Sequence, residues 1–359
     1  MKPIMERVRF TFVDALRGVA ASAVVLFHAV EGAHITALYE TMPAGLQVLL
    51  RHGDFGVAIF FVLSGFVIAH SLGTARLSIV GVLQFMLKRS IRLDPPYWAA
   101  IAVAILFSVL ASKIVANRPA ETYSVPQVAS HFFYLQALLG FKQINSVFWT
   151  LCLEIQFYSV YALLLWTRST YAMVAAFVIA LLWPLGLGPA APGVFVEFWY
   201  AFLLGVGANA AWRSPNVRPW FLGYVAVISA ASLHSTGYFA LVCCATAVSL
   251  LAVGVAGQLA SWLNWRWLQF LGTISYSLYL IHNPVTGAAF RAGYLITGRN
   301  IYTEAFWWIA SLAACVCAAS LFWYFIERPS ARLASQFGKR FATRRDVIAT
   351  SAQPAPSRD

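Results

Sequence analysis

The chain has 359 residues, of which 60% are apolar and only 11% are charged, and its mean hydropathy is +0.72. Soluble domains have about 45–50% apolar and about 25% charged residues, so a chain of this length cannot bury its apolar surface in a water-exposed fold. The formal net charge of +12 comes without a nucleic-acid-binding motif, and the basic residues fall mostly between apolar runs. We therefore predict an all-α, polytopic membrane protein that contacts the lipid bilayer and no nucleic acid.

Apolar runs of about 20 residues predict about ten transmembrane helices in one bundle. In chain order they cover 12–31, 54–72, 94–115, 147–166, 170–187, 194–211, 219–234, 237–257, 267–289 and 304–326. Segment 129–141 is a re-entrant or interfacial alternative, and eleven spans is the nearest other count. The first run carries Asp14, Arg17 and His28, which a cleavable signal peptide would not tolerate, so it is expected to remain as a helix.

The apolar pattern stops after Pro329, which predicts one integral domain over 1–332 and a basic, largely disordered tail over 333–359. With the N-terminus in the cytoplasm, 18 Lys and Arg residues fall on the cytoplasmic side and 6 on the other. This distribution places both termini in the cytoplasm. No internal repeat of the solenoid or transporter kind is visible. The five cysteines lie in apolar runs without metal-binding spacing, so we expect no metal site.

Charged and polar residues inside membrane helices are costly, so each one is a candidate for function. In the first helix, Arg17 and His28 are eleven residues apart, which places them on one face with a height difference of about 16 Å. Asp14 lies three residues before Arg17 and is expected to pair with it. The alternative is a structural ion pair and a histidine that a neighbouring helix satisfies.

Two further helices carry polar groups at a similar depth. Glu154 of the fourth helix is expected about 10 Å below the outer boundary. His28 and His282, in the first and ninth helices, come out about 24 Å and about 22 Å above the inner boundary of a layer about 30 Å thick. The three groups therefore converge toward the outer leaflet.

A basic segment, KRSIRLDPPYW, stands at the cytoplasmic mouth of the third helix. It places Lys88, Arg89 and Arg92 beside Tyr97 and Trp98. Clustered guanidinium groups bind phosphate bidentately, so the segment is a candidate anion site. In the alternative, the positive charges only set the orientation of the helix in the membrane, and Tyr97 and Trp98 lie at the membrane–water interface.

Taken together, these segments resemble the acyltransferase 3 family of bacterial membrane proteins over nearly the whole chain. The residues that carry the resemblance are Arg17 and His28, FFVLSGFVI (60–68), Arg89-x-x-Arg92-Leu93-x-Pro95-x-Tyr97, Phe148-Trp149-x-Leu151-x-x-Glu154-x-x-Phe157-Tyr158, Ile274-Ser275-Tyr276-Ser277-Leu278-Tyr279-Leu280-x-His282-x-Pro284 and Phe325-Ile326-Glu327-Arg328-Pro329. Each motif alone is weak, but six in this order are specific.

The resemblance implies an enzyme of the bacterial inner membrane that moves an acyl group from acyl-coenzyme A to a hydroxyl. Acetyl is the acyl group that the resemblance favours. The implied acceptors are surface sugars, lipid-linked glycans or secondary metabolites. Acyl-CoA is then a substrate, and no permanently bound cofactor is expected. The resemblance also implies that His28 is catalytic and that Arg17 and the arginines near the third helix help to hold the donor.

On this basis, Arg89 and Arg92 are predicted to hold the phosphates of coenzyme A, and Arg17 to meet the pyrophosphate or the pantetheine arm. His28 either deprotonates the acceptor or carries the acyl group itself. Glu154 is expected to orient the imidazole or bind acceptor hydroxyls, with a purely structural carboxylate as the alternative. The catalytic candidates are His28 and Glu154, and the substrate-binding candidates are Arg17, Asp14, Arg89, Arg92, Tyr97, Trp149, Tyr158 and His282.

Other polar residues carry no predicted chemistry. Ser64 is assigned to helix packing with Gly65, because no nucleophile elbow surrounds it. Asp54 and His34 are assigned to solvated positions, and Glu327 is assigned to the inner end of the last helix. Two rival functions stay open: a glycan or small-molecule transporter or flippase, and a non-catalytic partner of a polysaccharide synthase.

Overall fold

The structure is a computed structural model that describes residues 9–73, 78–114, 121–235 and 237–338. Within these residues, every regular element is helical and no strand is formed. The predicted all-α fold is therefore confirmed. Most of the predicted tail lies outside the described residues, and its first residues, 333–338, continue the last helix.

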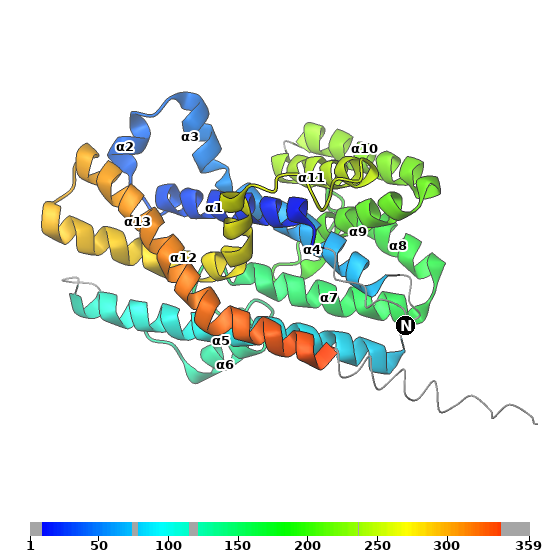
Figure 1. The fold of residues 1–359 in the computed structure, drawn as a ribbon, viewed down its shortest axis with the longest axis horizontal. Coiled ribbons are helices and arrows are strands. Elements are labelled where there is room, and N and C mark those ends of the chain that lie inside the picture. The colour runs from blue at the N-terminus through cyan, green and yellow to red at the C-terminus, as the bar shows by residue number, and fades with distance from the viewer. Residues whose placement is uncertain (1–8, 74–77, 115–120, 236, 339–359) are drawn as a thin grey trace, which may run out of the picture.

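Thirteen α-helices follow one another along the described chain (Figure 1). They are α1 (Thr11–Glu31), α2 (Thr36–Glu40), α3 (Ala44–Arg51), α4 (Gly56–Leu72), α5 (Ile79–Ile114), α6 (Val125–Phe132), α7 (Trp149–Thr167), α8 (Thr170–Ala180), α9 (Trp199–Arg213), α10 (Arg218–Ser235), α11 (Tyr238–Val255), α12 (Arg266–Thr297) and α13 (Ile301–Phe322). Short 3₁₀ turns cover Gly53–Phe55, Phe195–Phe198 and Pro215–Val217, and a π-helical turn over Trp323–Glu327 extends α13.

A helix occupies each of the ten segments predicted to span the membrane, but some boundaries differ. α5 begins at Ile79, well before residue 94, because the basic segment is itself helical and Pro95 and Pro96 do not end the helix. α8 ends at Ala180, and turns replace the rest of the predicted span. Residues 129–141 hold the end of α6 and irregular turns rather than a further spanning helix.

Six segments of the described chain are long and apolar enough to cross a membrane. They are 11–31, 53–72, 79–114, 149–167, 238–255 and 301–338. The remaining predicted spans form helices that are shorter or more polar, such as α9 and α12. Helix length and composition thus make this a multi-pass membrane protein.

Two helix pairs approach so closely that only glycine fits between them. A Cβ on Gly18 of α1 would lie 2.9 Å from the backbone nitrogen of Gly272 on α12. A Cβ on Gly65 of α4 would lie 1.9 Å from the carbonyl oxygen of Phe202 on α9. Small residues allow close backbone approach between membrane helices, so the packing role predicted for Gly65 is confirmed.

We expect the Gly65→Ala substitution to lower the unfolding temperature of the detergent-solubilised protein. The added methyl group must push α4 away from α9, and overpacking of this kind costs about 1–3 kcal/mol. Gly223→Ala is the matched control, because a Cβ at Gly223 of α10 meets nothing within 4 Å. That change should leave the unfolding temperature unchanged or raise it. An equal response of the two variants would contradict the close α4–α9 packing.

Three long helices, α1, α5 and α12, run in the same direction through the bundle. Gln269 near the start of α12 donates to the Thr11 carbonyl at the start of α1. At the far ends, the Tyr294 hydroxyl donates to the carbonyl of His34. Tyr276 of α12 reaches the Leu93 carbonyl of α5. All three helices therefore begin at one end of the bundle, which we call the first end, and finish at the other, the second end.

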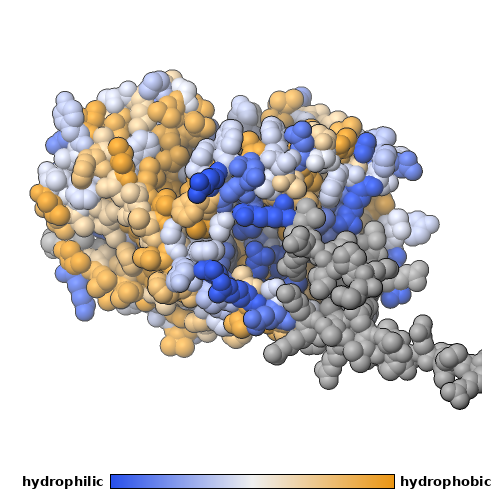
Figure 2. All heavy atoms as spheres, in the orientation of Figure 1, coloured by the Kyte–Doolittle hydropathy of each residue, from blue (hydrophilic) through white to orange (hydrophobic). Residues whose placement is uncertain are grey.

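The first and last described residues lie at the same end of the bundle. Arg9 contacts Gln269 at the start of α12, and Gly338 lies beside Lys88 in the first half of α5. Apolar side chains cover much of the face shown in Figure 2, and hydrophilic side chains gather in the right half of the view, where Figure 1 shows the start of α5. The first end is therefore the more polar and basic one.

Candidate active site

An open cavity with about 840 Å³ of empty space lies among α1, α4, α5, α7 and α12. Arg17, Arg89 and Arg92 line it, together with Glu154 and Tyr158. The Arg89 guanidinium lies over the Tyr158 ring, 4.9 Å from its centroid. The three arginines that the sequence proposed as donor-binding residues thus come together from two helices. We call this space the arginine cavity.

Glu154 belongs to the arginine cavity and not to the surroundings of His28. Its carboxylate accepts a hydrogen bond from Ser64, whose oxygen lies 2.7 Å from the Tyr158 hydroxyl. The charges of Arg89 and Arg17 also act on it. In the described chain, the hydrogen bonds of the His28 ring go elsewhere. The expectation that Glu154 orients the imidazole is therefore wrong, and its position is that of a counter-charge for the arginines.

A second carboxylate, Glu327, also faces the arginines, although the sequence assigned it to a helix end. It is buried and accepts hydrogen bonds from the backbone nitrogen and the hydroxyl of Ser277, at 3.2 and 2.5 Å. The charges of Arg17 and Arg92 act on it. The π-helical turn at Trp323–Glu327 sets this orientation, and such turns are frequent at functional sites. No periodicity in the sequence reveals the π-turn.

Three other candidates lie outside the lining of the arginine cavity. Asp14 pairs with Arg9 at 2.6 Å and not with Arg17 as predicted. The Tyr97 ring is buried against Tyr134, with 4.5 Å between ring centroids. Trp149 packs edge-on against Phe61. The predicted direct substrate contacts of Asp14, Tyr97 and Trp149 thus have no support from this cavity, because these side chains serve an ion pair and aromatic packing.

The His28 ring has a defined tautomer. Its Nδ1 lies 2.9 Å from the carbonyl oxygen of Val24. A carbonyl oxygen only accepts, so Nδ1 carries the proton and Nε2 presents an unprotonated lone pair. This lone pair faces the hydroxyl of Ser146, at an Nε2–Oγ distance of 3.5 Å. The sequence predicted His28 as the base, and the structure gives it a free basic nitrogen.

His282 lies against His28, and the sequence predicted a similar depth in the membrane for these two residues. Their ring centroids are 5.0 Å apart and the rings are nearly perpendicular. The His282 Nδ1 is shared between the carbonyls of Leu278 and Tyr279, at 3.1 and 2.9 Å, so its Nε2 is also unprotonated. This Nε2 is fully buried and has no hydrogen-bond partner within the described residues. Two imidazoles, each with an unprotonated Nε2, thus lie side by side, one near the end of α1 and one in the middle of α12.

Two carboxylates that the sequence did not assign to the site act on His28. The charges of Glu31 and Asp54 both act on the His28 ring. Asp54 is held there because Gly53 packs under α1, where a Cβ would lie only 2.2 Å from the carbonyl oxygen of Ala23. The Oδ1 atom of Asp54 is buried without a hydrogen-bond partner in the part of the chain described. In the sequence, the glycines at positions 53 and 56 are the feature that indicates close packing of this segment.

Tyr279 separates the arginine cavity from the two histidines. Its hydroxyl lies 2.7 Å from that of Thr150, and both residues line the cavity. The Tyr279 ring centroid is 6.1 Å from that of His282. The cavity therefore ends one aromatic ring away from the imidazoles. A long, thin ligand bound by the arginines would point its far end at this ring.

His34, in the turn between α1 and α2, should make the stability of the folded protein depend on pH. Burial lowers its pKa from 6.5 to about 4, and the charges of Arg291 and Arg299 add to the effect. Because the folded pKa lies below the unfolded value, the unfolded chain binds the proton more readily. We expect the folded state to lose stability as the pH falls from 6.5 to 4, measured as the unfolding temperature. His34→Asn should lose less over this interval, and an unchanged pH profile in that variant would contradict the assignment.

The sequence is also similar to those of known proteins. A family model described as an acyltransferase domain matches residues 10–326. In an alignment that is 393 positions long with its gaps, the chain is 25% identical to acyltransferase MdmB of Streptomyces mycarofaciens, and the alignment covers 97% of this chain and 96% of that protein.

In an alignment that is 371 positions long with its gaps, the chain is also 25% identical to the putative peptidoglycan O-acetyltransferase YrhL of Bacillus subtilis. That alignment covers 88% of this chain and 54% of the relative, so the chain spans about half of the relative's length. No solved structure matches the chain.

Proposed function

The chain belongs to the acyltransferase family whose model spans residues 10–326, and from this premise we propose which substrates it joins and how. The proposed donor is cytoplasmic acyl-CoA, with acetyl-CoA first, and the proposed acceptor is a hydroxyl of a cell-surface or lipid-linked carbohydrate. The relative named as a putative peptidoglycan O-acetyltransferase supports an acetyl group and a carbohydrate acceptor. The observation that carries the proposal is the unprotonated Nε2 of His28 one ring beyond a cavity lined by three arginines.

The arginine cavity suits a donor that is anionic at one end and apolar along its arm. Coenzyme A carries phosphates on its nucleotide end, and guanidinium groups bind phosphate with two parallel hydrogen bonds. Arg17, Arg89 and Arg92 supply three such groups, and the negative charges of Glu154 and Glu327 act on them. The arm would then extend along α1 toward Tyr279 and the histidines. The eleven residues from Arg17 to His28 correspond to about 16 Å of helix.

His28 acts as the general base in this proposal. Its Nε2 takes the proton of the acceptor hydroxyl while the alkoxide oxygen attacks the thioester carbon. The carbon–sulfur bond breaks, and the thiolate of coenzyme A takes the proton back, which leaves an ester, a free thiol and neutral His28. Asp54 and Glu31 stabilise the transient imidazolium. In a second route, His28 carries the acyl group itself and passes it to the acceptor.

We propose that the protein lies in the bacterial inner membrane with both termini in the cytoplasm. The excess of Lys and Arg on the terminal side supports this orientation, as does the position of residues 9 and 338 at one end of the bundle. The arginine cavity then opens toward the compartment that holds coenzyme A.

Consumption of labelled acetyl-CoA by the purified protein tests this function against transport. We expect release of free coenzyme A and transfer of the label to envelope carbohydrate added as acceptor. Movement of the carbohydrate across a liposome membrane with no acyl transfer would instead establish a flippase. Complete absence of acetyl-CoA consumption, with every short-chain acyl-CoA tried, would remove the enzymatic proposal.

A further inference from the structure

A second pocket lies at the second end of the bundle, away from the arginines. It has about 700 Å³ of empty space, and its walls come from α5, α12 and the segments that precede α6 and α7. α12 lines both spaces, with Tyr276 at the arginine cavity and Arg291 at this second pocket. Fifteen residues of helix separate these two positions, which is about 22 Å. The two spaces are therefore stacked along the helix axes with the histidines between them.

A chain of hydrogen bonds joins the second pocket to the base. The side-chain amide of Asn283 donates to the Ser146 hydroxyl at 2.9 Å and to the Asn145 side-chain oxygen at 3.2 Å. Asn145 donates in turn to the Leu280 carbonyl, which fixes its orientation. Ser146 accepts from Asn283, so its own proton is available to the His28 Nε2 at 3.5 Å. The Ser146 hydroxyl thus lies where an alcohol would have to lie in order to give its proton to His28.

The lining of the second pocket has the chemistry of a polyol site. Side-chain amides, hydroxyls and a guanidinium converge there from Tyr123, Asn145, Ser146, Asn283 and Arg291. These groups both donate and accept hydrogen bonds, as the hydroxyls of a sugar ring require. The arginine cavity differs, because its walls apart from the charged groups are largely aliphatic and aromatic.

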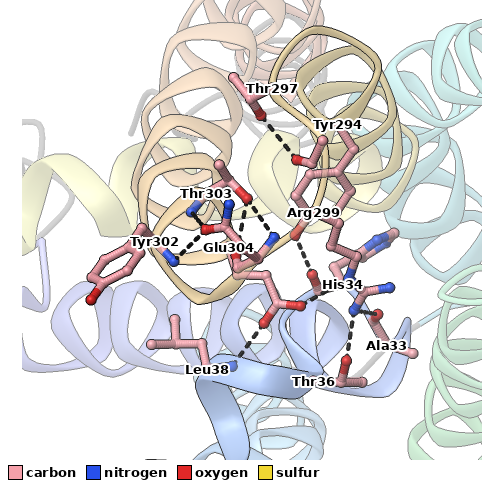
Figure 3. Close-up of polar contacts among 12 residues, drawn as sticks. Ala33, His34, Thr36, Leu38, Tyr294, Thr297, Arg299, Tyr302, Thr303 and Glu304 are labelled. Atoms are coloured by element: carbon pink, nitrogen blue, oxygen red, sulfur yellow. Dashed lines mark hydrogen bonds and ion pairs between the residues drawn. The ribbon is translucent and has the colours of Figure 1, made fainter.

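The edge of the second pocket is held by buried polar contacts (Figure 3). Glu304 of α13 is 1% exposed and accepts hydrogen bonds from Arg299 and from the backbone of Leu38, both at 2.8 Å. Arg299 also donates to the Ala33 carbonyl at 2.8 Å. His34 stacks on Phe290 with 4.7 Å between ring centroids. The turn after α1 is therefore fixed to α12, and a rigid edge lowers the entropic cost of ordering a ligand.

We propose that the second pocket is the acceptor site and takes a polyhydroxylated carbohydrate unit from the end of the bundle opposite to the donor. Asn283 is a positioning residue: its amide, which donates to Ser146 here, donates to the accepting hydroxyl when that hydroxyl takes the place of Ser146 at the His28 Nε2. The inference rests on the proposed O-acyltransferase function. Donor and acceptor then reach one base from opposite sides of the membrane.

Thiol labelling in sealed vesicles of both orientations tests this arrangement. The background carries Cys317→Ser, because the four other cysteines are buried. Ser108→Cys places a thiol in the second pocket, Val67→Cys places one in the arginine cavity, and Thr41→Cys places one outside both at the second end. The reagent is the membrane-impermeant sulfonatoethyl methanethiosulfonate. We expect it to label the Ser108→Cys and Thr41→Cys variants from one face of the membrane and the Val67→Cys variant from the other.

Protection by ligand identifies what each space binds. We expect chitotetraose or maltotetraose to slow labelling of the Ser108→Cys variant at least several-fold and to leave that of Thr41→Cys unchanged, while coenzyme A protects Val67→Cys. If the thiols in the second pocket and in the arginine cavity were labelled from the same face, the two-sided arrangement would be overturned. Protection of the second-pocket thiol by coenzyme A, or by neither oligosaccharide, would overturn the acceptor assignment. Absence of acetyl-CoA consumption would overturn the proposed function itself, and it is measured separately from this labelling.

The positioning role has its own measurement. With the oligosaccharide that gives protection, we expect Asn283→Ala to raise the acceptor KM at least tenfold, while the dissociation constant of acetyl-CoA stays at the wild-type value. Asn283→Gln, which keeps the amide donor, should recover part of the loss. A fall in kcat alone, or an equal loss of acetyl-CoA binding, would show that Asn283 serves the structure and not the acceptor.

Discussion

Replacement of His28 by asparagine will lower the rate of acyl transfer by about 10²–10⁴-fold, the usual contribution of a positioned general base. Asparagine keeps a polar side chain of moderate size, but it offers no basic nitrogen at the place of Nε2. Since His28 lies outside the lining of the arginine cavity, the dissociation constant of acetyl-CoA should stay near the wild-type value. The measurement is transfer of labelled acetyl groups under saturating donor, together with equilibrium binding of acetyl-CoA.

His52→Asn is the matched control for this variant. His52 is exposed, stacks on Phe55 near the same end of the bundle and lines neither space. It should therefore retain wild-type transfer. Full activity in His28→Asn would remove the imidazole from the mechanism, and loss of acetyl-CoA binding would place it in the donor site. Rapid quenching without acceptor separates the two chemical routes, because only the covalent route leaves labelled acyl-His28.

The positions of three guanidinium groups in apolar helices, together with the family resemblance, were enough to predict that these groups serve one site. Arg17, Arg89 and Arg92 are guanidinium groups in apolar helices, and such groups must gather around water, a counter-charge or a ligand. The structure places all three in one cavity. The similar depth of His28 and His282 was likewise predictable, because both helices run in the same direction and the residues stand at similar distances from their starts, but the contact of their rings was not.

The position of Glu154 was not predictable, because the sequence placed residue 147 at the outer boundary of the membrane. The chain instead reaches the level of His28 in an irregular segment, where Ser146 meets the imidazole. Thr150 then stands at the level of Tyr279, and Glu154 lies one turn closer to the arginines, about 6 Å further along α7. Height along a helix also says nothing of the direction in which a side chain points.

Residues that tertiary packing brings to the site were missed for a related reason. Asp54 precedes an apolar helix and reads as solvated, yet close packing of Gly53 under α1 brings its charge to His28. Glu327 reads as the last residue of a helix, yet a π-turn rotates it inward to Ser277. Both placements depend on backbone contacts between distant segments, which a single sequence does not display.

Replacement of Arg92 by glutamine will weaken binding of acetyl-CoA by about 10–150-fold, because a hydrogen bond to a charged group contributes about 1.5–3 kcal/mol. The loss should appear in the donor KM and dissociation constant, with kcat changed much less, because Arg92 meets the nucleotide end and not the reacting thioester. Arg266→Gln is the control, since Arg266 is exposed at the start of α12 and lines neither space. It should bind acetyl-CoA as the wild type does.

The phosphate contact itself is tested with acetyl-pantetheine, which has the same thioester and arm but lacks the nucleotide and its phosphates. Wild type and Arg92→Gln should use this truncated donor at equal, low efficiency, because the guanidinium has no phosphate to bind. Arg92 stands beside Glu327, so a structural defect in the variant would depress both donors alike. Selective loss with acetyl-CoA therefore identifies Arg92 as a ligand of the phosphates. An equal loss with both donors would show that Arg92 holds α5 against α13 and does not bind the phosphates.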